Sequence, residues 1–405
     1  MNTATRMGDA FFVDKKKWYF VAFFIMAVSA LRGIRYPNLW AYSHYLFNYD
    51  FGFVKRGLLG EILHVLNIPY LYTYQFFCLL SFLILLINFV LLGQIVKCFI
   101  DRGKPVLTFC ALLFVSSMAI VFLAHTVGYF DEIGLLVTLI SLKIEGFYKK
   151  LLILALLMPF LLLIHETAFV IFYPVLFVSL FFSIKKDAWN QQFPLLIVFS
   201  VLLLFLVVLL GHATLDANSA GHMFVNMQTK VGHHLRPDAF DVLDRGLERN
   251  VFLMQDVWSQ PDFATVFLLS LLVTVPVFAS FVLLFVYLLR GEKANGYLIV
   301  MCICAALSPL TLHFVAWDMH RWNTLTITTS FLTLYVVLGS IPKDPLFELE
   351  ARVFPIFVLL VFLNGASSIP LFDSFYVKDY PFSEHVKYIQ DVMSGDARSF
   401  SVPPR

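Results

Sequence analysis

Residues 193–212 read FPLLIVFSVLLLFLVVLLGH, a run of twenty positions without a single Lys, Arg, Asp or Glu. A helix of this length rises about 30 Å, which matches the hydrocarbon core of a bilayer. The whole chain is also rich in apolar residues: of its 405 residues, 60% are hydrophobic, 14% are charged and 45 are Phe. Soluble domains carry about 25% charged residues. The sequence therefore predicts a polytopic, all-α membrane protein that folds as a single transmembrane bundle.

Apolar runs of similar character recur along the chain. We expect about eleven transmembrane helices, since a span needs roughly 17–25 apolar residues. The runs at 129–147 and 149–165 are short and end in polar residues. The predicted spans are 18–34, 70–97, 105–125, 129–147, 149–165, 167–185, 193–212, 263–289, 296–316, 321–341 and 353–371.

The distribution of Lys and Arg between the spans predicts the orientation. With the N-terminus in the cytoplasm, the inside segments hold sixteen Lys and Arg, and the outside connections hold five, leaving aside the loop 213–262 and the tail 372–405. Short cytoplasmic loops are enriched in these residues. We therefore predict an N-in, C-out protein of the bacterial inner membrane. The stretch 1–18 (MNTATRMGDAFFVDKKKW) is expected to be a basic cytoplasmic flank leading into a retained first span.

Composition and motifs exclude several functional classes. The five cysteines lie in or beside apolar runs, which predicts neither a disulfide framework nor a cysteine metal site. A net charge of only +2 argues against nucleic acid as a partner. The chain contains no Walker loop and no Rossmann fingerprint, so a nucleotide-binding site is not expected on the cytoplasmic side.

The first outside segment, 35–69, combines aromatic and charged residues. Its second half, FGFVKRGLLGEILHVLNIP (51–69), has the pattern of an amphipathic helix lying at the membrane interface. One interpretation is an interfacial anchor with snorkelling Lys55 and Arg56. The other places Asp50, Lys55 and Arg56 at the mouth of the bundle, where a Lys-Arg pair beside glycines suits a phosphate.

Two further outside connections carry ionisable residues. In HTVGYFDEIGLL (125–136), Asp131 and Glu132 open the fourth span, where they either complement the helix dipole or line a site. In LLLIHETAF (161–169), His165 and Glu166 lie between two apolar runs with almost no loop to hold them. Ionisable groups at membrane depth usually face a cavity or a partner, although a tight interfacial turn is the simpler alternative.

The stretch AWDMHRWN (316–323) precedes the tenth span. Asp318, His320 and Arg321 are flanked by two tryptophans, which fit an interfacial aromatic belt or a sugar-stacking surface. Arg321 is the preferred phosphate contact of the three. The loop 213–262, which includes GHHLRPD (232–238), is expected to be a partly helical lid or a solvated surface.

The polar groups of the outside segments define the expected chemistry. Carboxylates, histidines and arginines at the outer face suit an enzyme whose donor is already in the membrane, such as a polyprenyl-phosphate or polyprenyl-diphosphate sugar. Basic residues would hold the leaving phosphate, and a carboxylate would accept the proton of an acceptor hydroxyl. The expected partners are therefore the lipid bilayer, a polyprenyl-linked sugar, and a glycan or lipid-linked acceptor.

This layout resembles the GT-C superfamily of membrane glycosyltransferases. The resemblance rests on an acidic residue in the first outside loop, in FNYDFGFVKRG, and on a second acidic position in YFDE, and it covers the first four spans in outline. It implies Asp50 as catalytic base and Asp131 or Glu132 as a second acid or a member of a site for Mg or Mn. The first loop departs from many members of the superfamily in having a single acid rather than a pair.

Two alternatives remain open from the sequence. Polysaccharide and O-antigen polymerases are of similar size and composition, and they also join polyprenyl-linked sugars. A proton-coupled transporter or flippase is the other alternative, with His165 and Glu166 as a proton relay. The absence of a visible internal repeat speaks against the transporter.

Overall fold

The computed structural model describes residues 14–231, 235–316, 318–341, 350–366, 371–373 and 376–378, together with 386 and 390. Trp317, His233, His234 and most of the predicted tail 372–405 lie outside the described residues. The described chain is helical apart from one antiparallel pair of short strands, β1 (Leu371–Asp373) and β2 (Tyr376–Lys378). The predicted helical class is therefore confirmed, with this small addition.

Six segments of the described chain are long and apolar enough to cross a membrane. Each overlaps a predicted span, so the prediction of several transmembrane helices agrees with the structure. Breaks in some of them have local causes: α6 and α7 are separate because Ser117 caps α7 with its own side chain. The six segments are α5 (Tyr74–Asp101), α6 with α7 (Pro105–Ser116 and Met118–His125), α9 (Phe147–Ile164), η2 with α12 (Lys186–Ala188 and Trp189–His212), α16 (Pro261–Gly291) and α17 with η4 (Gly296–Leu307 and Ser308–Phe314).

Each of the other five predicted spans also contains a helix, but these helices do not meet the same criterion of length and hydropathy. α8 has only 12 residues, and the run at 167–185 is divided into two short helices. The predicted count of eleven therefore stays a prediction. These helices are α2 (Lys15–Gly33), α8 (Asp131–Leu142), α10 (Ala168–Ile171) with α11 (Tyr173–Phe182), α18 (Met319–Ser340) and α19 (Glu350–Ala366).

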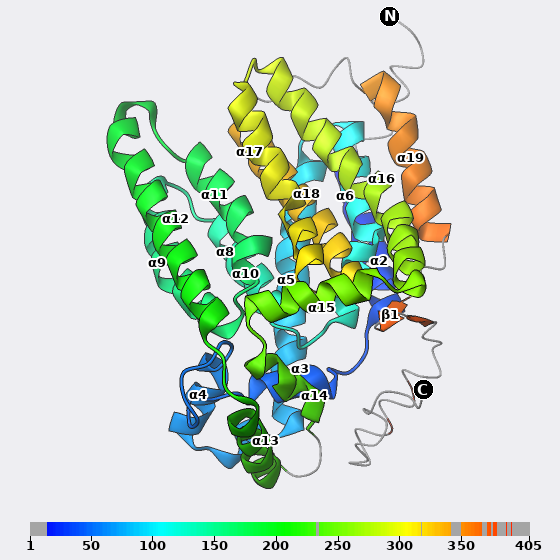
Figure 1. Ribbon diagram of the computed structural model, residues 1–405. Helices are drawn as coiled ribbons and strands as arrows, with labels where there is room; N and C mark the ends of the chain where they lie inside the picture. The colour runs from blue at the N-terminus through cyan, green and yellow to red at the C-terminus, as the bar shows by residue number, and fades with distance from the viewer. Residues whose placement is uncertain are drawn as a thin grey trace, which may run out of the picture.

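Helix α18 lies in the middle of the bundle, where it packs against α16, α17 and η4 (Figure 1). It is buried along most of its length although it is rich in threonine. The hydroxyl of Thr333 donates to the carbonyl of Thr329 one turn earlier (2.7 Å), and the hydroxyl of Thr329 donates to the carbonyl of Ala306 in α17 (2.6 Å). Buried hydroxyls with such partners are tolerated in an apolar core, and they let helices approach closely.

The segments predicted to lie outside gather at one end of the molecule, the lower end in Figure 1. Two backbone amides join the first segment to the long loop: that of Lys55 donates to the carbonyl of Ala213 (3.4 Å), and that of Arg236 to the hydroxyl of Ser43 (3.0 Å). The predicted interfacial helix is confined to α4. The elements at this end are α3 (Leu39–Tyr45), α4 (Leu58–Leu66), η1 (Pro69–Tyr72), α13 (Ala217–Val231), α14 (Pro237–Phe240), η3 (Asp241–Asp244) and α15 (Leu247–Trp258).

Candidate functional site

The centre of the site is a buried ion pair between the first turns of two helices. Asp131 opens α8 and Arg321 lies in the first turn of α18, and their side chains are only 4% and 7% exposed. The Nε of Arg321 donates to one carboxylate oxygen of Asp131. Its Nη1 donates to Asp318 at 3.0 Å. Arg321 therefore joins two carboxylates that the sequence places almost 190 residues apart.

His165 completes this cluster from a third segment. It follows the last residue of α9 in an extended conformation, which turns its ring away from the helix. Its Nε2 lies 3.0 Å from Nη2 of Arg321, 3.2 Å from Oδ1 of Asp131 and 2.7 Å from the hydroxyl of Thr167. One nitrogen cannot accept from Arg321 and donate to Asp131 at once, because a ring nitrogen either carries a proton or does not. Nε2 of His165 therefore either accepts from Arg321 and Thr167 or donates to Asp131.

A second ion pair lies directly beside the first. Arg56 binds Glu166, the neighbour of His165, through two hydrogen bonds of 3.0 and 2.7 Å. This bidentate geometry is the stronger form of an arginine–carboxylate pair. Burial alone would raise the pKa of the Glu166 carboxyl, but the Arg56 guanidinium outweighs it and holds the pKa well below its usual range. Glu166 is therefore an anion at neutral pH.

Lys55 and Arg56 are held in place by the long loop and by an unusual backbone. The ammonium of Lys55 donates to the carbonyl of Arg245 (2.5 Å), and Arg56 has a positive φ of 64°. A non-glycine residue in this region is uncommon and is kept there by its surroundings, here the bond to Glu166. Burial lowers the pKa of Lys55 to about 8. Lys55 is thus a cation at pH 7 that loses its proton under mildly alkaline conditions.

Asp50 lies apart from this cluster. Its carboxylate accepts from Asn48 (2.8 Å) and lies 3.3 Å from Nδ1 of His64 and 4.0 Å from the ammonium of Lys230. The side chain is 27% exposed, in contrast to Asp131. The structure therefore brings together seven of the ten predicted residues, while Asp50 occupies a separate, more open position. The seven are Lys55, Arg56, Asp131, His165, Glu166, Asp318 and Arg321.

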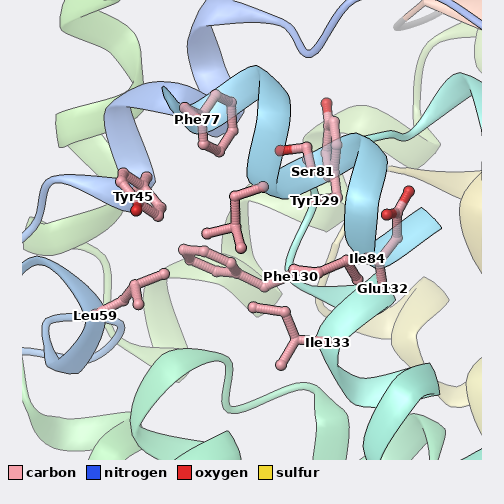
Figure 2. Close-up of a pocket in the computed structure, with 11 residues that line it drawn as sticks. Tyr45, Leu59, Phe77, Ser81, Ile84, Tyr129, Phe130, Glu132 and Ile133 are labelled. Atoms are coloured by element: carbon pink, nitrogen blue, oxygen red, sulfur yellow. The ribbon is translucent and has the colours of Figure 1, made fainter. Parts of the chain in front are cut away.

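Glu132 is buried beside Asp131 but has different surroundings. It is 1% exposed, and neither carboxylate oxygen has a hydrogen-bond partner within the described residues. Its backbone carbonyl accepts from the amide of Asn88 in α5 (2.9 Å). The residue lines a small cavity between α3, α4, α5 and α8 (Figure 2). In the described chain, Asp131 and Glu132 are the only carboxylates with less than a tenth of their surface exposed, and only Asp131 is paired.

His320 belongs to a different polar group of α18. It is buried close to His313, whose Nε2 lies 2.9 Å from the amide oxygen of Asn323. The amide of Asn323 in turn donates to the hydroxyl of Ser270 in α16 (2.9 Å). These contacts connect α18 to α16 and η4. A role in helix packing therefore explains this polar group.

The sequence analysis missed two residues of the site. His44 is buried and packs against Trp40 in a tilted arrangement with ring centroids 3.8 Å apart, and it lies within electrostatic range of Arg56, His165 and Glu166. Burial, followed by the nearby Arg56, lowers its pKa well below the ordinary value, so it is neutral. The guanidinium carbon of Arg321 lies over the ring of Tyr129, 5.0 Å from the ring centroid. The only signal for either residue was its place in a polar outside segment.

The residues of the site do not fit a divalent cation. Both oxygens of Asp131 face His165 and Arg321, and a guanidinium in contact with a carboxylate opposes a metal ion there. Within the described residues, no three His, Cys, Asp or Glu side chains converge as metal ligands do. The predicted Mg or Mn is therefore not assigned to this cluster.

The fold and the site place the protein in a class. It is a helical membrane protein with a buried ionic cluster at one end of its bundle. Comparison with family models, curated proteins and solved structures gives no match for this chain.

Proposed function

We propose that the protein is a membrane glycosyltransferase that moves a sugar from a polyprenyl-phosphate or polyprenyl-diphosphate donor to an acceptor on the outer face of a bacterial inner membrane. The observation that supports this most is the meeting of Arg321, Asp131, His165, Glu166 and Arg56 in one buried cluster. Five ionic or ionisable groups from four segments are costly to bury together, and such groups in a membrane protein are usually functional.

In this proposal Arg321 receives the leaving phosphate. Asp131 is buried and holds Nε, whereas Asp318 is 39% exposed and holds Nη1. A phosphate can therefore displace Asp318 from Arg321 without disturbing Asp131, because water can solvate the Asp318 carboxylate once it is released. The bond between the anomeric carbon and the phosphate oxygen breaks as the acceptor oxygen attacks, and the guanidinium stabilises the charge that develops on the phosphate.

A carboxylate must accept the proton of the acceptor hydroxyl. The resemblance to GT-C enzymes favours Asp50, which is partly exposed and held by Asn48 and His64. The structure offers Glu132 as an alternative, because it lines a cavity and has no partner within the described chain. The variants Asp50→Asn and Glu132→Gln keep the shape of each side chain, so their turnover rates distinguish the two.

The test is sugar transfer by membrane vesicles that contain the overproduced protein. Undecaprenyl phosphate carrying one radiolabelled hexose, tried as glucose, galactose and mannose, is supplied with a crude glycan acceptor fraction. We expect label to leave the lipid fraction with wild-type protein. Arg321→Ala should reduce this by at least about 100-fold, the loss typical of removing one donor to a developing anion.

The matched control is Arg290→Ala, an exposed arginine at the other end of the molecule, in α16. It should transfer at the wild-type rate. Equal rates for Arg321→Ala and wild type, at equal amounts of inserted protein, would contradict the proposal. A polymer of graded length among the products would identify the acceptor as a growing polysaccharide and the protein as a polymerase within the same reaction class.

Proton-coupled transport is the second candidate, and one observation favours it. Glu132 is a buried carboxyl without a hydrogen-bond partner in the described residues, which is the environment of a group that takes up and releases a proton. The transport alternative predicts proton movement into proteoliposomes when a substrate gradient is applied. Movement that Glu132→Gln abolishes, in preparations without transferase activity, would favour transport.

A further inference from the structure

Helix α15 lies across the lower end of the bundle in Figure 1, whereas its neighbour α16 runs along the bundle. One side of α15 is buried in a small core, in which Met254 and Val257 join Phe263 of α16 and Met319 of α18. Met319 is the first residue of α18, two positions before Arg321. α15 is therefore packed into the same end of the bundle that holds the ionic cluster.

A second side of α15 is apolar but exposed. It holds Leu247 (57% exposed), Val251 (39%) and Trp258 (38%), which point within about 40° of one another around the helix, given 3.6 residues per turn. A third side is exposed and largely polar, and it holds Glu248, Arg249, Phe252, Gln255 and Asp256. The helix therefore presents one side to the protein, one apolar side outward and one polar side outward.

The exposed apolar side of α15 adjoins the lipid-facing surface of the bundle. The indole ring of Trp258 makes a T-shaped contact with Phe267 in α16 (ring centroids 4.9 Å apart), and its Nε1 donates to the carbonyl of His313 in η4 (3.2 Å). The next residues of these two elements, Leu268 and Phe314, are both exposed. Apolar side chains exposed along membrane-spanning helices face hydrocarbon. The apolar side of α15 and this surface therefore meet at Trp258.

The position and the pattern of α15 together indicate what covers its apolar side. Exposed leucine and valine side chains are unfavourable in water, and tryptophan is enriched where a bilayer meets water. From these observations we infer that α15 is an interfacial helix: its apolar side inserts among the phospholipids of the leaflet next to the ionic cluster, and its polar side faces water. Such helices insert about 5–10 Å into the boundary between head groups and acyl chains.

This inference changes the interpretation of the loop 213–262. The sequence left open a lid or a solvated surface, whereas an interfacial α15 is neither. Because Met319 lies in the same small core, the first turn of α18, with Arg321, would lie near the lipid head groups. The inference holds whichever reaction the protein performs, because it uses only the exposure and the position of α15.

The test is spin-label accessibility in lipid nanodiscs that each hold one copy of the full-length protein. Val251→Cys carries the nitroxide on the apolar side, and Glu248→Cys, the matched control, carries it on the polar side, with the exposed Cys98 and Cys304 changed to serine. Oxygen partitions into hydrocarbon, whereas the nickel complex NiEDDA stays in water. We expect relaxation by oxygen to exceed relaxation by NiEDDA at position 251, and this ratio to reverse at position 248.

Only this reversal between the two positions supports the interfacial helix. NiEDDA in excess at both positions would show that water covers both outward sides, and oxygen in excess at both would show that the polar side is also submerged. Weak relaxation by both reagents at position 251 would show that a protein surface covers it. Each of these three results overturns the inference. If labelled Val251→Cys is not recovered folded, Leu247→Cys on the same side is read in the same way.

Discussion

Arg321 is the residue on which the site depends most. Its planar guanidinium binds Asp131, Asp318 and His165 together, which a lysine cannot reproduce with one ammonium group. The sequence predicted Asp131, His165, Glu166 and Arg321 as unusual polar groups on one side of a membrane. It did not predict which of them pair, because the pairs join residues 110 to 190 positions apart and only the packing of the helices sets their distance.

Removing Arg321 should destabilise the protein strongly. Arg321→Met leaves the Asp131 carboxylate buried without its main partner, which typically costs about 3–5 kcal/mol of unfolding free energy. The double variant Asp131→Leu/Arg321→Met should recover most of this loss. Thermal unfolding in detergent measures the loss in the single variant and the recovery in the double variant. The control Arg249→Met breaks an exposed pair with Asp244 and should cost at most about 1 kcal/mol. Equal losses for Arg321→Met and Arg249→Met would contradict the burial of the cluster.

Lys55 gives the site a predictable pH dependence. Its pKa is lowered by burial to about 8, whereas the unfolded chain has the ordinary value of 10.5. The unfolded state therefore binds more protons between pH 8 and 10.5, and stability from this group rises with pH across that window. The groups near Lys55 are Glu166, Arg56, Arg245 and Asp244.

We expect Lys55→Met to be more stable than wild type at pH 7, by up to about 3 kcal/mol, because it removes a buried cation. This advantage should shrink as the pH rises from 8 to 10.5. Thermal unfolding of both proteins across pH 6.5–10 measures the difference. A difference that stays constant over this range would show that the pKa of Lys55 is not lowered.

Helices α2 and α7 approach each other closely at a glycine. A Cβ on Gly33 would lie 2.0 Å from the backbone carbonyl oxygen of Val121. Such an overlap cannot be relieved by a side-chain rotation, so one helix would have to move. Close contact through small residues is a common way for membrane helices to pack.

Gly33→Ala should therefore lower the unfolding free energy by about 1–3 kcal/mol. Gly211→Ala in α12 is the matched control, since nothing lies within 4 Å of its added Cβ. There alanine should be neutral, or stabilising by up to about 1 kcal/mol, because it favours the helix. Thermal unfolding of the two variants tests this, and a neutral Gly33→Ala would mean that α2 and α7 are not in contact at this position.

Among the helices, the sequence predicted the positions along the chain but not the breaks. Each of the eleven apolar runs contains a helix in the described chain, because long apolar periods dominate any local signal. The interruption between α6 and α7 at Ser117 and the end of α8 at Leu142, before the predicted end at 147, were not predicted. Capping and helix length depend on single polar residues and on neighbours in space, which an apolar pattern does not contain.

The two ends of the whole molecule are predicted to lie on opposite sides of the membrane. The polar end formed by α3, α4, α13, α14 and α15 is predicted to face outward, and the connection between α16 and α17 inward. We expect Glu248→Cys, in α15, to react with a membrane-impermeant maleimide on intact cells, in a background with the exposed Cys98 and Cys304 changed to serine. Glu292→Cys, at the end of α16, should react only after permeabilisation. The reversed pattern would invert the predicted topology.

The decisive measurement is whether sugar transfer uses only donor in the leaflet next to the polar end. Purified protein is reconstituted into vesicles whose orientation is read out by the maleimide assay, and the crude glycan acceptor fraction is supplied on both sides. Undecaprenyl phosphate carrying a 14C-labelled hexose is placed only in the leaflet next to the polar end or only in the opposite leaflet. We expect undecaprenyl phosphate to be released when the donor lies next to the polar end, at a rate that Arg321→Ala reduces by about 100-fold and Arg290→Ala leaves unchanged. Release from the opposite leaflet alone, or release that Arg321→Ala does not reduce, would contradict it.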